Sequence, residues 1–140
     1  MEKDNVILQK SMEFSIRIVN LYKYLQKEKK ETVLSNQLLR SGTSIGANVR
    51  EGVYGQRRGD FLSKMRIALK ESSETEYWLE LLSRTGYINE HEYESIKEDC
   101  SEIARLLTAI VKSLKKKMFI VNCSLLIGEG VGERRIRGEA

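Results

Sequence analysis

The sequence contains no proline, and this absence is the first guide to its fold. Proline interrupts an interior helical turn, because it lacks a backbone N–H and clashes with the preceding turn. Charged residues make up 31% of the chain and apolar residues 41%, which together with the missing proline suits long uninterrupted helices. A chain of 140 residues is long enough for one domain with a core. The composition therefore predicts a single all-α domain.

Cysteine and histidine are too few for a metal centre or for the usual nucleophilic sites. Cys100 and Cys123 stand far apart without a CxxC pattern, and His91 is the only histidine. A lone histidine builds neither a catalytic triad nor a zinc site. We therefore expect no enzyme, no metal and no cofactor, and two cysteines without a pairing pattern favour a reducing, cytoplasmic location.

Long apolar runs are also missing. No stretch approaches the roughly 18 residues that a membrane span needs. The chain opens with Met1-Glu2-Lys3-Asp4 rather than with the apolar core of a signal peptide. We expect neither export nor a membrane partner.

Apolar residues recur at steps of four and three in four successive segments, which keeps them on one face of a helix. The expected helices cover about residues 4–29, 33–54, 60–85 and 90–117. Their inward stripes are Ile7, Ser11, Phe14, Ile18, Leu21 and Leu25; Leu34, Leu38, Ser41, Ile45, Asn48 and Gly52; Phe61, Met65, Ala68, Ser72, Thr75, Leu79 and Leu82; and Tyr93, Ile96, Cys100, Ile103, Leu107, Ile110 and Leu114. Four similar helices with short turns predict an up-down-up-down four-helix bundle over residues 1–117.

Residues 118–140 are expected to form a separate C-terminal tail. Met118–Ile127 contains no charged residue, and its pattern leaves three alternatives open: an extension of the fourth helix, a strand, or a segment docked on a neighbouring chain. The glycine-rich residues 128–140 are expected to be disordered and flexible.

Small residues are concentrated in the second expected helix, between Arg40 and Gly52. Neither a GxxxxGK[ST] pattern nor a strand-linked GxGxxG accompanies them, so a phosphate-binding loop is poorly supported. In an antiparallel pairing with the third helix, Gly52 lies opposite Phe61 and Ser41 lies opposite Ser72. We therefore interpret the glycines as a close-approach face between these two helices.

Glu71 and Glu74 border the apolar stripe of the third helix, where paired carboxylates could suggest a metal site. Di-metal sites in bundles combine glutamates with Glu-x-x-His motifs, which this chain lacks. We expect these carboxylates to pair with Arg40 or with hydroxyl groups of the second helix.

Positive charge is predicted to gather at one end of the bundle. The net charge is +4, but residues 71–100 carry −7 while residues 31–70 and 101–117 carry +4 each. An up-down topology places the second turn and the end of the fourth helix at the same pole. That pole collects Arg50, Arg57, Arg58, Lys64, Arg66, Lys112, Lys115, Lys116 and Lys117. Such a cluster suits nucleic-acid phosphates, and ordinary solvated helix faces are the alternative.

Two helices carry more apolar residues than one core stripe requires. These residues are Met12, Ile16 and Val19 on the first helix and Trp78 and Leu81 on the third. They indicate either a wider core or an interface between copies. We favour homo-oligomerisation, because the surplus residues lie on two different helices.

A pattern R-S-x-x-S-I-x-x-N-x-x-E-G runs from Arg40 to Gly52, and Asp60-Phe61-Leu62 and the segment 68–79 follow it. These motifs resemble the bacterial four helix bundle protein family, which includes proteins encoded within intervening sequences of 23S ribosomal RNA genes. Accessory variability proteins of diversity-generating retroelements are among its relatives. The resemblance covers about residues 5–117. We interpret the motif positions as structural: Arg40, Ser44, Asn48, Glu51, Gly52, Glu71 and Glu74.

The resemblance implies a four-helix protomer, often assembled as a ring-like pentamer with a basic surface or channel. It also implies nucleic-acid binding, in some members together with a reverse transcriptase. Our hypothesis is a non-enzymatic, homo-oligomeric bundle that binds RNA or DNA phosphates without base readout. The alternative is a protein-interaction scaffold that binds no nucleic acid.

Overall fold

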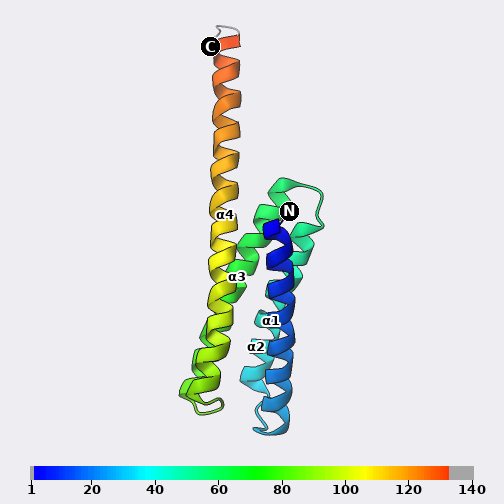
Figure 1. The fold of residues 1–140 in the computed structure, drawn as a ribbon, viewed down its shortest axis with the longest axis vertical. Coiled ribbons are helices and arrows are strands. Elements are labelled where there is room, and N and C mark those ends of the chain that lie inside the picture. Colours follow the sequence, from blue (N-terminus) through cyan, green and yellow to red (C-terminus); the bar gives the residue numbers. More distant parts are fainter. Residues whose placement is uncertain (1, 133–140) are drawn as a thin grey trace. The chain divides into compact units, whose positions relative to one another are not determined.

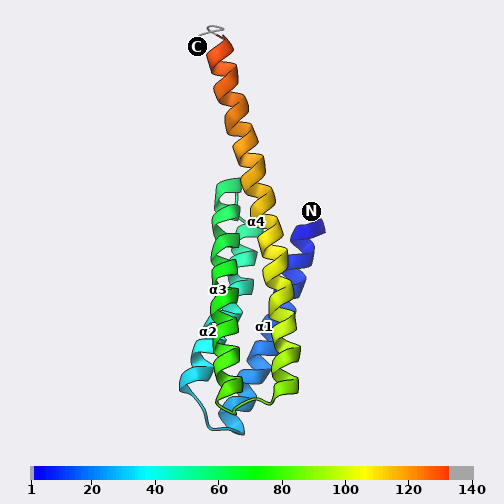
Figure 2. The same cartoon turned by 90° about the vertical axis from the view of Figure 1, so that its left-hand side faces the viewer.

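The computed structural model describes residues 2–132, which fold into four helices. They are α1 (Glu2–Lys27), α2 (Val33–Val53), α3 (Arg58–Arg84) and α4 (Glu90–Gly132). Successive helices run in opposite directions within residues 2–109 (Figures 1 and 2). The predicted all-α class and four-helix bundle are confirmed. No helix in the described part of the chain is long and apolar enough to cross a membrane.

The chain divides into two compact units, Met1–Ala109 and Ile110–Ala140, and α4 continues through the boundary between them. We call the first the bundle unit. The segment Met118–Ile127 extends the fourth helix, which was one of the three alternatives. Residues 128–132 also belong to α4. Their glycines weaken a helix but keep the backbone N–H that proline would remove. Residues 133–140 lie outside the described residues.

The core of the bundle unit follows the predicted stripes. Every stripe residue of α1, from Ile7 to Leu25, is buried. The stripe of α3 is buried apart from Phe61, and the stripe of α4 within the bundle unit is buried apart from Tyr93; both of these are half-buried. The pattern missed Val49 and Leu62, which are also buried.

The α2 helix packs closely against α1 at Gly42 and Gly46. A Cβ atom on Gly42 would lie 2.8 Å from Cγ1 of Ile18, and one on Gly46 would lie 3.1 Å from Oγ of Ser15. Real Cβ atoms essentially never come as close as the first of these distances. The prediction that the glycines face the third helix is therefore wrong for Gly42 and Gly46, which instead let α2 approach α1.

Gly52 does face α3, as predicted. Its Cβ would lie 2.7 Å from Cε of Met65 and 3.4 Å from Cδ1 of Phe61. Gly52 follows Gly42 by ten residues, a rotation of about 280° at 100° per residue, so the two glycines lie on different faces of α2. Because α2 packs against both neighbours, it needs a small residue on each face.

The register between α2 and α3 differs from the prediction at Ser41. Its hydroxyl accepts a hydrogen bond of 3.0 Å from Oγ1 of Thr75, rather than facing Ser72. The Ser72 hydroxyl donates to the carbonyl of Leu69 within its own helix. The prediction paired the two helices residue for residue, from Gly52 opposite Phe61 to Ser41 opposite Ser72. It therefore misplaced Ser41 by about one helical turn.

We predict that Gly42→Val destabilises the protein by about 1–3 kcal/mol, because the added side chain overlaps Ile18 in a packed core. The matched control is Gly59→Val in the first turn of α3, where an added Cβ meets nothing within 4 Å. The control should change stability by about 0.5 kcal/mol at most. Urea unfolding followed by circular dichroism measures both. Equal midpoints for the two variants would contradict the close approach of α2 to α1.

Candidate nucleic-acid interface

The arginines of the bundle unit divide into two groups. The first group forms ion pairs with carboxylates of the same chain and consists of Arg17, Arg40, Arg84 and Arg105. The second group forms no ion pair with any residue that the structure describes and consists of Arg50, Arg57, Arg58 and Arg66. All four unpaired arginines are exposed and come from residues 50–66, around the α2–α3 turn.

Two of these arginines lie where α3 begins. Arg57 is the N-cap residue, with an extended backbone (φ −115°, ψ 143°) and no side-chain cap, and Arg58 is the first helical residue. The first turn of a helix leaves backbone N–H groups without intrahelical partners and carries a partial positive charge. Asp60 is the only acidic residue in this turn. Arg57 and Arg58 therefore add full charges to a position that already attracts anions.

Lys64 differs from the arginines because its charge is already compensated. Its Nζ lies 2.9 Å from Oε1 of Glu51, which links α3 to the last turn of α2. Arg66 lies two residues further along and borders a groove between α3 and α4. Lys70, which the prediction missed, borders the same groove four residues after Arg66. Arg66 and Lys70 are four residues apart and therefore neighbours on one helix face, so this spacing in the sequence could have predicted Lys70 as a further cation.

The other predicted cations belong to the second unit. Lys112, Lys115, Lys116 and Lys117 are all exposed on the continuation of α4. Lys112, Lys115 and Lys116 have helical spacings of three and four, which place them on one face of their own helix. The cations from residue 50 to residue 66 surround the α2–α3 turn in sequence but do not share one face, since Arg50 borders the α1–α2 groove and Arg66 borders the α3–α4 groove. The four lysines belong to the second unit.

Arg40 of the family motif forms ion pairs with the two glutamates of α3. Its guanidinium lies 3.4 Å from Oε1 of Glu71 and also contacts Glu74, and the indole N–H of Trp78 donates to Glu74 over 3.0 Å. The predicted pairing of these carboxylates with Arg40 is confirmed. Within the described residues, no group of three or more His, Cys, Asp and Glu side chains could hold a metal ion.

Ser44 and Asn48 interact with each other rather than with a distant partner. The Asn48 amide donates to the Ser44 carbonyl over 2.8 Å and lies 3.0 Å from the Ser44 hydroxyl. Asn48 is half-buried, so its predicted place on the core stripe is only partly correct. These hydrogen bonds lie within one turn of α2, at the edge of the core.

Cys100 has the environment of a core residue. Burial, together with the negative charges of Glu76 and Asp99, raises the pKa of the Cys100 thiol to about 12. The thiol is therefore neutral near pH 7, and its Sγ donates to the carbonyl of Ser72 over 3.5 Å. A neutral, buried thiol is a poor nucleophile.

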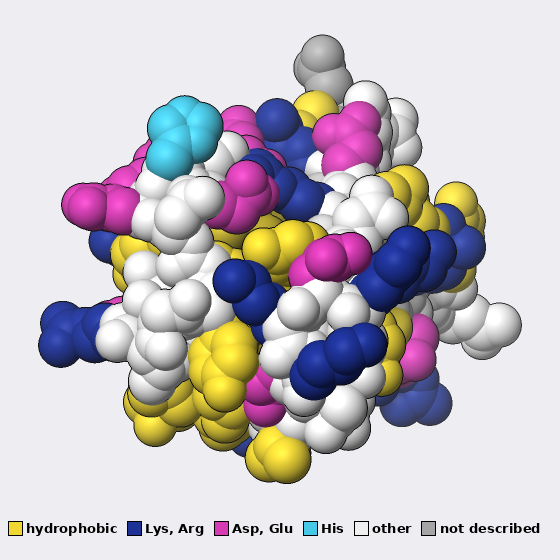
Figure 3. All heavy atoms as spheres, turned by 90° about the horizontal axis from the view of Figure 1, so that it is seen from below, with side chains coloured by type: hydrophobic (Ala, Val, Ile, Leu, Met, Phe, Trp, Pro, Cys, Tyr) yellow, Lys and Arg dark blue, Asp and Glu magenta, His cyan; other side chains and the backbone are white. Residues whose placement is uncertain are grey.

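The opposite end of the bundle unit carries both signs of charge. It is formed by the α1–α2 and α3–α4 turns, and the end view in Figure 3 shows acidic, basic and apolar side chains interspersed. Residues 90–99 supply five carboxylates against a single lysine. Arg17 of α1 partly compensates them through Asp99 (2.7 Å) and Glu92 (3.2 Å).

The fold and the unpaired arginines define a class: an all-α, four-helix protein with a cationic interhelical turn. The family model for 23S rRNA-intervening sequence proteins matches residues 3–109, and the chain belongs to this family. It is also similar to a crystal structure of a protein with unknown function from the S23 ribosomal protein family of Bacteroides thetaiotaomicron. That protein is 62% identical, with a TM-score of 0.77, over 79% of this chain and 98% of the other. No curated protein matches the chain.

Proposed function

We propose that this protein is a non-enzymatic homo-oligomer that binds RNA or DNA through the α2–α3 turn. The observation that carries this proposal is the segregation of the arginines. The other arginines of the bundle unit form ion pairs with carboxylates of the same chain. No such ion pair to a described residue is formed by the remaining four, Arg50, Arg57, Arg58 and Arg66. Arginine binds phosphate through two parallel N–H donors, so arginines without an ion pair in the chain are well suited to a nucleic-acid backbone.

The surroundings of the turn favour binding that does not depend on base sequence. Phosphate contacts position a nucleic acid but do not read its bases. Tyr54, beside the arginines, is 74% exposed and offers a ring on which any base can stack. Single-stranded RNA is the first ligand to test, because its exposed bases are free to stack on such a ring.

Homo-oligomerisation is supported by apolar side chains that remain outside the core. Met12 and Ile16 are 45% and 55% exposed and lie one helical turn apart on α1. A groove of about 260 Å³ lies beside Met12 on the surface where α1 meets α2. Trp78 and Leu81 on α3 are half-buried. A pentamer is the assembly that the family resemblance implies, and the cytoplasm is the location we propose.

The double variant Arg57→Ala/Arg58→Ala should weaken binding of single-stranded RNA and lessen its salt dependence. Each lost phosphate contact lowers the slope of log K against log salt by about 0.7 for single strands, so we expect a change of about 1.4. Fluorescence anisotropy across a salt series measures this slope.

The matched control is Lys27→Ala/Lys29→Ala, which removes the same charge at the α1–α2 turn and should leave the slope unchanged. Equal changes in both variants would show that net charge, rather than the α2–α3 turn, governs binding. Absence of binding at low salt would remove the nucleic-acid proposal and favour the protein-interaction scaffold.

Ile16→Glu should dissociate the oligomer while preserving the fold, because it places a charge in an apolar contact. Val33→Glu is the control, since Val33 is 71% exposed at the start of α2, where a carboxylate is favourable. Light scattering after gel filtration gives the mass of each variant. A monomeric unsubstituted protein, or an Ile16→Glu oligomer of unchanged mass, would contradict this assignment of the interface.

A further inference from the structure

The continuation of α4 in the second unit exposes three consecutive large apolar side chains. Phe119, Ile120 and Val121 are exposed by 67%, 52% and 52%. Successive helix residues are about 100° apart, so these three side chains spread over about 200° of the helix circumference. The seam of a coiled coil is a narrower stripe. A single partner helix would therefore leave part of this apolar surface in water.

Positive charge directly precedes the apolar residues. The lysines of this part of α4 are all exposed and form no ion pair with a residue that the structure describes; they are Lys112, Lys115, Lys116 and Lys117. Residues 118–128 contain no charged residue. The helix thus carries a cationic cluster and, next to it, an uncharged apolar segment.

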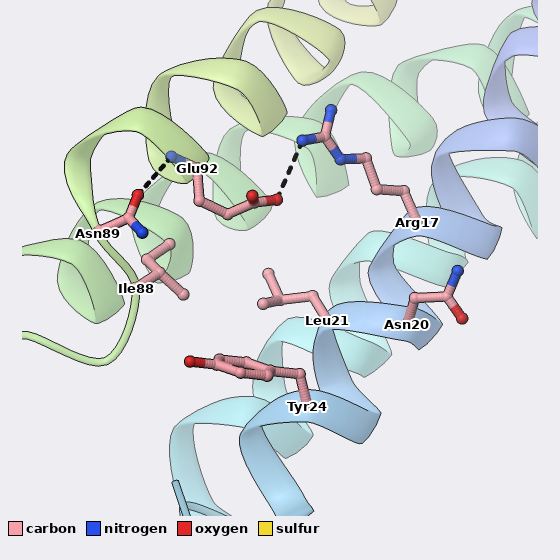
Figure 4. A pocket seen from close by; sticks show the side chains of 7 residues that line it. All are labelled: Arg17, Asn20, Leu21, Tyr24, Ile88, Asn89 and Glu92. Carbon is pink, nitrogen blue, oxygen red and sulfur yellow. Dashed lines mark hydrogen bonds and ion pairs between the residues drawn. The ribbon is translucent and has the colours of Figure 1, made fainter. Parts of the chain in front are cut away.

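The carboxylates of α4 are remote from this cluster in sequence. They lie within residues 90–102, where Arg17 of α1 already binds both Glu92, as Figure 4 shows, and Asp99. No acidic residue follows Glu102 until Glu129. Pairing of residues 103–128 with the same residues of a second copy, in either direction, would therefore add positive charge and no carboxylate. A surface that is both anionic and apolar complements this segment better than a second copy does.

We propose that the segment Lys112–Ile127 binds the surface of an anionic phospholipid bilayer. The lysines bind the phosphate and carboxylate groups of the lipid headgroups, and Phe119, Ile120 and Val121 enter the boundary between the headgroups and the acyl chains. Binding of a helix to a membrane surface strengthens with buried apolar area and with attraction to anionic lipids, and this segment offers both. The inference does not depend on nucleic-acid binding at the α2–α3 turn.

The length of the apolar segment limits it to one face of the bilayer. Met118–Ile127 spans ten residues of helix, or about 15 Å, whereas the hydrocarbon core is about 30 Å thick. Attachment to a surface needs no spanning helix. The proposal therefore replaces the expectation of no membrane partner, which depended on the missing long apolar run.

Flotation of the full-length protein with lipid vesicles tests the attachment. Vesicles of phosphatidylserine and phosphatidylcholine in equal amounts should carry the protein, and vesicles of phosphatidylcholine alone should carry far less. Each lysine near an anionic surface strengthens binding about fivefold, so Lys115→Ala/Lys116→Ala/Lys117→Ala should weaken it about a hundredfold. The matched control, Lys23→Ala/Lys27→Ala/Lys29→Ala, removes the same charge from exposed positions near the end of α1 and should leave flotation unchanged.

Entry of the apolar residues into the lipid is tested by fluorescence. Phe119→Trp places an indole in the segment, whereas the unsubstituted protein has Trp78 of the bundle unit as its only tryptophan. Phosphatidylserine vesicles with brominated acyl chains should quench the added fluorescence of the variant. They should leave the fluorescence of the unsubstituted protein unchanged.

Four results would overturn the inference. The first is absence of flotation with phosphatidylserine vesicles, and the second is flotation without quenching, which means adsorption by charge alone. The third is a lysine variant that binds RNA more weakly but floats unchanged, which assigns the cluster to nucleic acid. The fourth is a blue-shifted emission from the Phe119→Trp variant before vesicles are added, with no quenching afterwards, which means that a second copy covers the segment.

Discussion

The close approach of α2 to α1 at Gly42 and Gly46 is the constraint on which the rest of the bundle unit depends. Without side chains at these positions, Ile18 and Ser15 come within contact distance of the α2 backbone. The opposite side of α2 then meets α3, through Gly52 and the buried Ser41–Thr75 hydrogen bond. Because α2 is held on two sides, the short turn that follows it projects from a fixed position.

This arrangement separates the family motif from the proposed function. Arg40 forms ion pairs with Glu71 and Glu74, and Glu51 forms one with Lys64. These motif residues therefore hold α2 against α3. Arg50, at a variable position near the end of the motif, and Arg57, Arg58 and Arg66 beyond it have no such partners among the described residues. The motif therefore maintains the scaffold, and we assign the contact with phosphates to the turn that the scaffold presents.

Periodicity predicted the helices and nearly all of their buried faces, because burial of a helix face depends on spacing within one segment. It could not predict which neighbour each face meets. Gly42 and Gly46 were assigned to α3 because sequence spacing does not specify the rotation of α2 between two partners. The ion pairs posed the same difficulty: Arg17 and Asp99 are 82 residues apart, so only the fold distinguishes paired from unpaired arginines.

Amide hydrogen exchange of the full-length protein, with and without single-stranded RNA, tests the central claim most directly. The first-turn amides of α3, at Arg58, Gly59 and Asp60, have no intrahelical acceptor and should exchange quickly in the free protein. Our account predicts that bound RNA slows exchange at these amides and leaves the turn between Arg84 and Glu90 unchanged. RNA binding that slows exchange at the latter turn, but not at the start of α3, would contradict it.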